Sequence, residues 1–276
     1  MPTRTDPITL PWGLSALRRL PIPRKLGLLE LLFGRTLASY GVSWIQTSNG
    51  VVWKLNLAEA SERWIVFGDY EGPVQMNWIR SRLARGGVVV DSGANIGQML
   101  LYLAPMPSVR IYAIEPVPEH VEWLGECLSG YPGWNVRLIE KGLSEASGKA
   151  IIQCWGARST TRLDWYSGRN FNRIEIPLDR LDAILEEHGE DKVALWILDV
   201  EGGEEAALKG ATGYLERGQI EAILIETLSD KSIQLLRRHR YDFFKFQRNG
   251  KLTSLTTDLE ILANRNVVVL LGVEYK

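Results

Sequence analysis

An acidic residue and a glycine-rich turn follow the apolar run at residues 88–90. Asp91 comes directly after that run, and Gly93, Asn95 and Gly97 follow it. A strand that turns tightly into a helix is a common cradle for a nucleotide-like cofactor. In the dinucleotide turn G-x-G-x-x-G, the middle glycine lets the backbone approach a pyrophosphate. Here Asn95 replaces that glycine and Gly97 comes one residue early, so the turn favours a cofactor without a pyrophosphate. S-adenosylmethionine (SAM) is such a cofactor.

A second carboxylate lies where such folds bind the ribose of a cofactor. Glu115 ends the next apolar run, 18 residues after Gly97, and a carboxylate there can accept hydrogen bonds from both ribose hydroxyls. We expect Asp91 to bind the ammonium of the methionine part, directly or through water. Gly93 would let the cofactor lie against the backbone, and Gly97 would open the helix. The alternative is that the glycines only make a tight strand–helix turn.

Strands and helices alternate around this turn. Apolar runs predict strands, and the segments between many of them read as helices, which indicates a parallel sheet covered on both faces. The last two runs have no ordinary helix between them and predict an antiparallel addition. The fold class is therefore α/β, a Rossmann-like, doubly wound, seven-stranded, mostly parallel sheet with an antiparallel last strand. The predicted strands are 87–91, 109–115, 135–139, 193–199, 220–226, 241–247 and 266–273, and the predicted helices are 97–104, 118–128, 204–217 and 230–240.

Acids end four of these strands, where ligands bind in such sheets. They are Asp91, Glu115, Asp199 and Glu226. Transfer of the methyl group of SAM to an alcohol needs a base close to the reacting oxygen. Asp199 and Glu201 are the candidates for this base, or for the group that orients the acceptor. Alternatively, these acids cap the helix that begins near Glu204. Asp199 and Glu226 could also share a Mg²⁺, but nothing in the sequence compels it and no metal site is predicted.

Two domains are expected, residues 1–85 and residues 86–276. The first is a helical and hairpin extension that packs on the second: strands at 42–46 and 51–57 flank the turn Ser48-Asn49-Gly50, between helices at 24–39 and 72–85. The basic, leucine-rich segment 18–35 could touch a membrane surface. Packing of its leucines on the domain is the preferred interpretation, so no stable membrane association is expected.

Several blocks of the sequence resemble the FkbM-type methyltransferase family. The similar blocks are GDYEG at 68–72, VVVDSGANIG at 88–97, IYAIEPVPE at 111–119, GLSEASGKA at 142–150, IPLDRLD at 176–182, LDVEGGEEAALKGA at 198–211 and IEAILIE at 220–226. The resemblance implies a class I methyltransferase fold with SAM as cofactor, and O-methylation of a small-molecule, sugar or natural-product hydroxyl. It also implies cofactor contacts by Tyr70 and Glu71, and by Pro116, Gly142 and Leu143 in the matching blocks, with Asp199 beside them.

The sequence departs from the family pattern at two places. The family usually has a lysine two residues before the aspartate of DVEG, where this chain has Ile197. It often has a histidine shortly after the glutamate that ends the fifth strand, where this chain has Thr227 and Leu228. Both changes remove a titratable group. N-methylation of a peptide or amide acceptor is therefore a second interpretation, with a nicotinamide-dependent oxidoreductase and a non-catalytic partner protein as further alternatives.

Composition narrows the class of partner. The formal net charge is −1, from 32 Lys and Arg against 33 Asp and Glu, whereas a dedicated nucleic-acid binder usually carries a basic excess. Cys127 and Cys154 are the only cysteines, too few for a disulfide framework. We therefore expect a cytoplasmic enzyme with a small-molecule or peptide acceptor and no nucleic-acid partner. A homodimer is compatible with these features.

Overall fold

The computed structural model describes residues 6–18, 20, 25–68, 73–155, 158–160 and 172–272. It divides into two compact units, one formed by residues 1–76 and 126–131 and the other by residues 77–125 and 132–276. The sequence-based boundary at residue 85 stays a prediction. No helix in the described part of the chain is both long and apolar enough to span a membrane.

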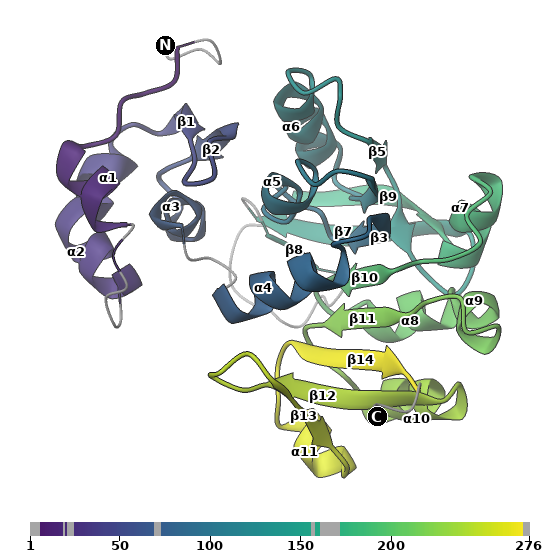
Figure 1. Ribbon diagram of the computed structural model, residues 1–276. Helices are drawn as coiled ribbons and strands as arrows, with labels where there is room; N and C mark the ends of the chain where they lie inside the picture. The colour runs from purple at the N-terminus through teal and green to yellow at the C-terminus, as the bar shows by residue number, and fades with distance from the viewer. Residues whose placement is uncertain are drawn as a thin grey trace. The chain divides into compact units, whose positions relative to one another are not determined.

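The first unit combines short helices with one hairpin (Figure 1). The predicted hairpin is present, and Gly50 has a φ of 85° in its turn. The helix α3 was not predicted; it ends at Gly68, whose φ of 77° is left-handed and stops the helix. The elements of this unit are α1 (Trp12–Leu17), α2 (Lys25–Ala38), β1 (Val42–Gln46), β2 (Val52–Asn56) and α3, the last spanning Ala60–Phe67.

Only part of the leucines of α2 pack as expected. Leu29 and Leu37 are fully buried, whereas Leu31 is 82% exposed and Leu32 53% exposed. Because a helix has 3.6 residues per turn, Leu31 and Leu32 lie on the side of α2 opposite to Leu37. The expectation that these leucines pack on the domain is therefore correct for one face of α2 and wrong for the other.

The second unit is built on an eight-stranded sheet with the order β13-β12-β14-β11-β10-β3-β4-β5. Strands β11, β10, β3, β4 and β5 pair in parallel, and β14 runs antiparallel to both β11 and β12. The predicted Rossmann-like class with an antiparallel last strand is confirmed. The strands are β3 (Gly87–Ser92), β4 (Val109–Ile114), β5 (Val136–Ile139), β10 (Leu195–Leu198), β11 (Ala222–Ile225), β12 (Tyr241–Phe246), β13 (Leu252–Leu255) and β14 (Val267–Leu271).

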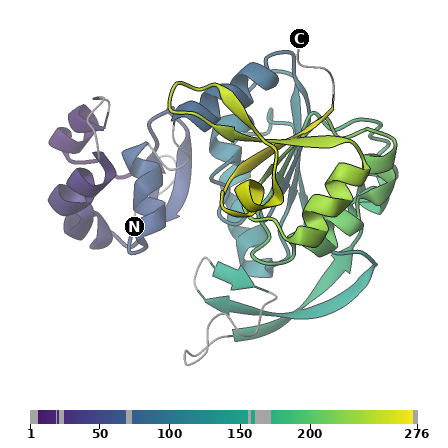
Figure 2. The same cartoon turned by 90° about the horizontal axis from the view of Figure 1, so that it is seen from below.

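The sheet has one strand more than predicted, because β13 pairs with β12 across the turn that contains Asn249 and Gly250. Helices α7 to α10 contribute to the main hydrophobic core on one face of the sheet, and α5 lies on the other face (Figures 1 and 2). The helices are α4 (Pro73–Arg82), α5 (Leu100–Leu103), α6 (Pro118–Leu128), α7 (Leu181–Glu187), α8 (Glu204–Lys209), α9 (Thr212–Glu216), α10 (Asp230–Arg238) and α11 (Asp258–Leu262).

Two predicted helices are shorter than the sequence indicated. The helix expected over 97–104 is reduced to α5 and its flanking turns, and Pro105 follows too closely for the helix to continue. The helix expected over 204–217 is two helices, α8 and α9. A Cβ on Gly210 would lie 2.0 Å from the carbonyl oxygen of Ser144, so the backbones approach closely where α8 ends.

The long segment between β5 and β10 forms a second sheet of four strands in the order β6-β9-β7-β8. It stands out from the eight-stranded sheet in Figure 2. A small core of Val117, Ile152 and Ile176 packs against it. Residues 161–171, between β8 and β9, lie outside the described residues. Its strands are β6 (Gly142–Leu143), β7 (Gly148–Trp155), β8 (Arg158–Thr160) and β9 (Asn172–Asp179).

Candidate active site

The four strand-end acids are brought to one rim of the sheet. β11, β10, β3 and β4 are neighbours and run parallel, so their carboxyl ends lie on the same side. Asp91 is in β3, level with Ile197 and Ala113, and Glu115, Asp199 and Glu226 each follow the last residue of their strand. Ligands of doubly wound sheets bind outside this edge. The rim is therefore the candidate active site.

The turn after β3 is built for close approach between backbones. Gly93 has a φ of 82°, and a Cβ there would lie 1.8 Å from the carbonyl oxygen of Asp199. Asn95 also has a left-handed φ, 49°, which is uncommon outside glycine and tolerated best by Asn and Asp. Gly97 has a φ of 85° and lies in the turn before α5, where its carbonyl accepts from the amide of Leu101. The backbone conformation of the turn therefore explains why Gly93, Asn95 and Gly97 occupy these positions.

Glu115 is held by the turn that it faces. Its side chain is buried, and its Oε2 accepts the Asn95 amide at 2.8 Å. Its Oε1 accepts the amide of Val117 at 3.1 Å and lies 3.2 Å from Nδ1 of His120. His120 is itself buried at this position. These contacts fix a carboxylate at the rim beside the glycine-rich turn.

Pro116, Gly142 and Leu143 meet where β4 and β6 end or begin. A Cβ on Gly142 would lie 2.8 Å from a methyl of Leu178 and 3.7 Å from Cβ of Pro116. Leu143 is buried, and its side chain belongs to the main hydrophobic core. Any contact that Leu143 makes with a ligand would therefore come from its backbone. Tyr70 and Glu71 lie outside the described residues.

Asp199 is the most perturbed acid of the rim. Burial in the protein, the negative charges of Glu226 and Glu201, and a hydrogen bond shared with Glu226 raise the pKa of Asp199 to about 8. Its Oδ1 is buried and has no hydrogen-bond partner among the residues that the structure describes. Carboxylates that share a site cannot all ionise freely, so one of them keeps its proton to a higher pH. Asp199 can therefore hold or accept a proton close to neutral pH.

The neighbours of Asp199 divide into functional candidates and structural groups. Glu204 is buried, and its Oε1 accepts the amide of Gly202 at 3.1 Å, so it satisfies the turn before α8. Glu201 has a φ of 50° in that turn, a conformation that costs energy for a non-glycine residue. The sequence predicts Glu226 as one of the four acids at the ligand-binding edge and as a possible partner of Asp199 around a Mg²⁺. It is the residue that pairs with Asp199, and it also lies 3.5 Å from Arg265.

No group of three or more histidine, cysteine and acidic side chains suited to a metal ion occurs among the described residues. A Mg²⁺ needs only one or two protein carboxylates, so the finding concerns larger groups of ligands than the pair of Asp199 and Glu226.

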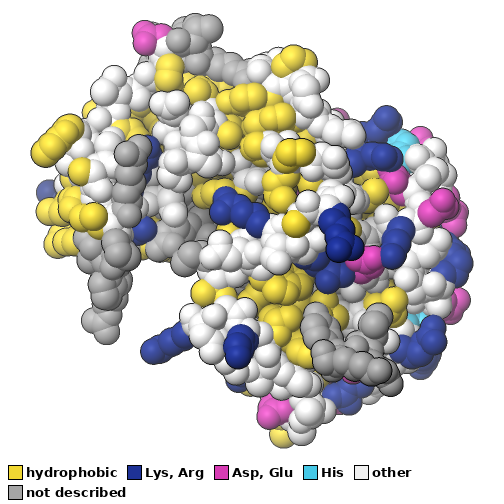
Figure 3. Space-filling view, in the orientation of Figure 1, with side chains coloured by type: hydrophobic (Ala, Val, Ile, Leu, Met, Phe, Trp, Pro, Cys, Tyr) yellow, Lys and Arg dark blue, Asp and Glu magenta, His cyan; other side chains and the backbone are white. Residues whose placement is uncertain are grey.

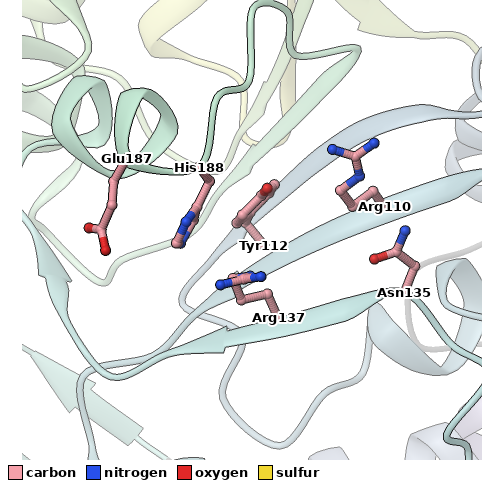
Figure 4. A pocket seen from close by; sticks show the side chains of 6 residues that line it. All are labelled: Arg110, Tyr112, Asn135, Arg137, Glu187 and His188. Carbon is pink, nitrogen blue, oxygen red and sulfur yellow. The ribbon is translucent and has the colours of Figure 1, made fainter.

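A separate hollow lies at the other end of β4 and β5 (Figure 4). It measures about 420 Å³ and has a largely polar lining. The rings of Tyr112 and His188 stack with their centroids 5.3 Å apart, and Oε1 of Glu190 accepts from the Tyr112 hydroxyl at 2.5 Å. Arg110, at the start of β4, is five residues and ~16 Å of strand away from Glu115, so this hollow is distinct from the rim. Its lining residues are Arg110, Tyr112, Asn135, Arg137, Glu187 and His188.

Comparison with known proteins points to one family. The sequence pattern of the methyltransferase FkbM domain matches residues 91–243, more than half of the chain. No curated protein matches the sequence significantly.

Among solved structures, an O-methyltransferase from Thermotoga maritima described as SAM-dependent is 14% identical, over 82% of this chain and 75% of that one, with a TM-score of 0.37. A precorrin-6y C5,15-methyltransferase from Geobacter metallireducens is 13% identical, over 72% and 87%, also with a TM-score of 0.37. Likeness at this level carries no argument about the reaction.

Proposed function

Because the chain belongs to the FkbM family of SAM-dependent methyltransferases, we propose that it transfers a methyl group to a hydroxyl of a small-molecule, sugar or natural-product acceptor. The family's cofactor is SAM, which sets aside the nicotinamide alternative. The observation that carries the choice of a hydroxyl is the raised pKa of Asp199. An alcohol must lose its proton during transfer, and a base is most effective when its pKa is near the working pH.

The residues of the rim fit SAM in their chemistry. Its ribose offers two hydroxyl donors, and Glu115 is a buried acceptor fixed beside the turn by the Asn95 amide. Its methionine part carries an ammonium, and Asp91 is a buried carboxylate on the neighbouring strand. Bound SAM supplies the electrophilic methyl group. The chain contributes binding, orientation and exclusion of water, which are the main sources of rate in such a displacement.

We assign proton removal to Asp199 and support of that role to Glu226. The shared hydrogen bond and the negative charge of Glu226 favour the protonated form of Asp199. Asp199 therefore binds the proton of the acceptor more tightly than an ordinary carboxylate would. Trp196, three residues earlier, donates from Nε1 to Oγ of Ser92 at 2.8 Å. That bond ties β10 to β3 just before the rim and would limit movement of Asp199. Glu201 is proposed to orient the acceptor.

An amine-bearing acceptor is the second candidate. Glu201, Glu204 and Glu226 each interact electrostatically with Asp199, and such a group of carboxylates attracts a cationic acceptor. Ile197, in the place of the family's lysine, is buried and adds no positive charge. The hydroxyl is preferred because an amine is the stronger nucleophile and depends less on a base.

A labelled-methyl experiment tests the proposal. The chain is incubated with methyl-labelled SAM and matched pairs of acceptors that differ only in carrying a hydroxyl or an amine. We expect label on oxygen, and Asp199→Asn should abolish transfer while leaving SAM affinity within about threefold, since the acid is assigned to the acceptor. Label on nitrogen alone would support the second candidate. Full transfer by the Asp199→Asn variant would contradict the assigned base.

We also propose that the reaction takes place in the cytoplasm. Cys127 and Cys154 are both free thiols, which accords with a reducing compartment.

A further inference from the structure

Helix α2 in the first unit has two apolar faces, and only one of them is covered. Leu29 and Leu37 on the covered face are fully buried. Leu28, Leu31 and Leu32 are 38%, 82% and 53% exposed, and their spacing of three and four residues places them on one side of the helix. A single exposed leucine would need no explanation, but three leucines on the solvent side of a 14-residue helix form an apolar patch that does.

The neighbouring helix also carries an exposed apolar side chain. Trp12, the first residue of α1, is 87% exposed, and α1 packs on α2. Hydrophobic side chains gather over these two helices in Figure 3. Exposed Trp and Leu side chains in one segment are typical of chains that enter the boundary between lipid head groups and acyl chains. We call Trp12, Leu28, Leu31 and Leu32 the α1–α2 apolar face.

Basic residues outnumber acidic residues in the segment of sequence that carries this face. Residues 12–40 contain five basic residues, Arg18, Arg19, Arg24, Lys25 and Arg35, and one acid, Glu30. The segment therefore has a formal charge of +4, within a chain whose formal net charge is −1. Glu30 forms a salt bridge with Arg63, whose nitrogen lies 2.5 Å from its carboxylate. The single acid of the segment is thus engaged by a largely buried arginine.

We propose that the α1–α2 apolar face binds an anionic membrane surface. Basic residues attract acidic head groups, and the leucines and the tryptophan enter the interface beneath them. With 14 residues, α2 is shorter than the ~20 needed to cross a bilayer, so it would lie along the surface and bind reversibly. The proposal is independent of the acceptor of the methyltransferase.

Charge decides between this occupant and the other candidates. Two copies meeting through this face would bring a formal +4 against +4, which opposes self-association. A nucleic acid would satisfy the basic residues but would leave the leucines without an apolar partner. An anionic bilayer meets both requirements at once.

Vesicle flotation of the full chain tests the proposal. We expect binding to vesicles of phosphatidylcholine with about one-third phosphatidylserine, and at least tenfold weaker binding to phosphatidylcholine alone, since each basic residue near an anionic surface contributes about fivefold. Leu31→Ser with Leu32→Ser should weaken binding at least tenfold, because each buried leucine side chain contributes that much or more. High salt should weaken binding of the wild type.

Leu259→Ser is the matched control, because Leu259 in α11 is 81% exposed and Leu31 is 82% exposed. It should bind vesicles as the wild type does, and both variants should keep the wild-type SAM affinity and circular dichroism. The proposal is overturned if the wild type does not float with anionic vesicles, or if the Leu31/Leu32 variant floats equally well. It is also overturned if that variant instead abolishes a concentration-dependent dimer seen by sedimentation without lipid.

Discussion

Replacing Glu226 by glutamine should lower the pKa of Asp199. Glutamine keeps the size of the side chain and can still form a hydrogen bond, but it removes the negative charge beside Asp199. Burial is the largest cause of the raised pKa of Asp199, followed by the charges of Glu226 and Glu201 and the hydrogen bond shared with Glu226. The variant therefore removes the influence of one neighbour and leaves burial unchanged.

The size of the effect follows from these contributions. The pKa of Asp199 lies at about 8, against an ordinary value of 3.8. A like charge in direct contact accounts for roughly one to two units, which corresponds to ~1.4–2.7 kcal/mol. We expect a pKa of about 6 to 7 in the variant. Loss of the contact between Glu226 and Arg265 should lower the free energy of unfolding by less than about 1 kcal/mol, because the Arg265 side chain is 78% exposed and such ion pairs are screened by solvent.

A carbon-13 titration of the carboxyl groups measures this pKa without knowledge of the acceptor. The resonance of Asp199 is identified by its absence in Asp199→Asn. Once an acceptor is known, the acidic limb of the pH–rate profile should move down by the same amount. Glu221→Gln is the control, because Glu221 precedes the other end of β11 and pairs with Arg82 and Lys192, so its loss should leave the pKa of Asp199 unchanged.

The reasoning is refuted if Glu226→Gln leaves the midpoint of the Asp199 titration unchanged or moves it upward. An equal shift in Glu221→Gln would also refute it, since a general change in net charge would then explain the result.

Two further variants test the rim. Asp199→Asn should flatten the dependence of stability on pH. In the wild type, the contribution of Asp199 to stability is fully present below its unfolded pKa near 4 and is lost as pH rises through its folded pKa of about 8. The variant should therefore melt a few degrees above the wild type at pH ~9 in calorimetry, and parallel curves of stability against pH would contradict this. Gly93→Ala should unfold more easily by ~3 kcal/mol or more in urea, since its Cβ would overlap the carbonyl of Asp199. Gly250→Ala, with a φ of 86° and nothing within 4 Å, should lose only ~1 kcal/mol; equal losses would show that the close approach is unimportant.

The succession of strands along the chain and the acids at the ends of four of them could be predicted because they depend on local patterns. Four of the apolar runs end on an acid, and parallel pairing then places Asp91, Glu115, Asp199 and Glu226 on one rim. The sequence also held an unused signal for β13. Asn249-Gly250 is a strong hairpin turn, and it joins β12 to β13.

Other features depend on contacts between distant residues and could not be predicted from one sequence. The sequence places Asp199 and Glu226 close enough to share a metal ion, but the burial that raises the pKa of Asp199 depends on packing. The burial of His120 against Glu115 depends on how α6 begins after β4. Leucines occur on several sides of α2, so packing within the first unit decides which of them are covered.

Calorimetric titration of SAM into the wild type and Glu115→Gln tests the central claim most directly, namely that the rim beside the glycine-rich turn holds the cofactor. We expect the wild type to bind SAM and not NAD, and the variant to bind SAM at least tenfold more weakly, because hydrogen bonds to a charged group contribute ~1.5–3 kcal/mol each. Thermal melting confirms that the variant is folded, since Glu115 also accepts the Asn95 amide. Absence of SAM binding by the wild type, or equal affinity in the folded variant, would contradict the account.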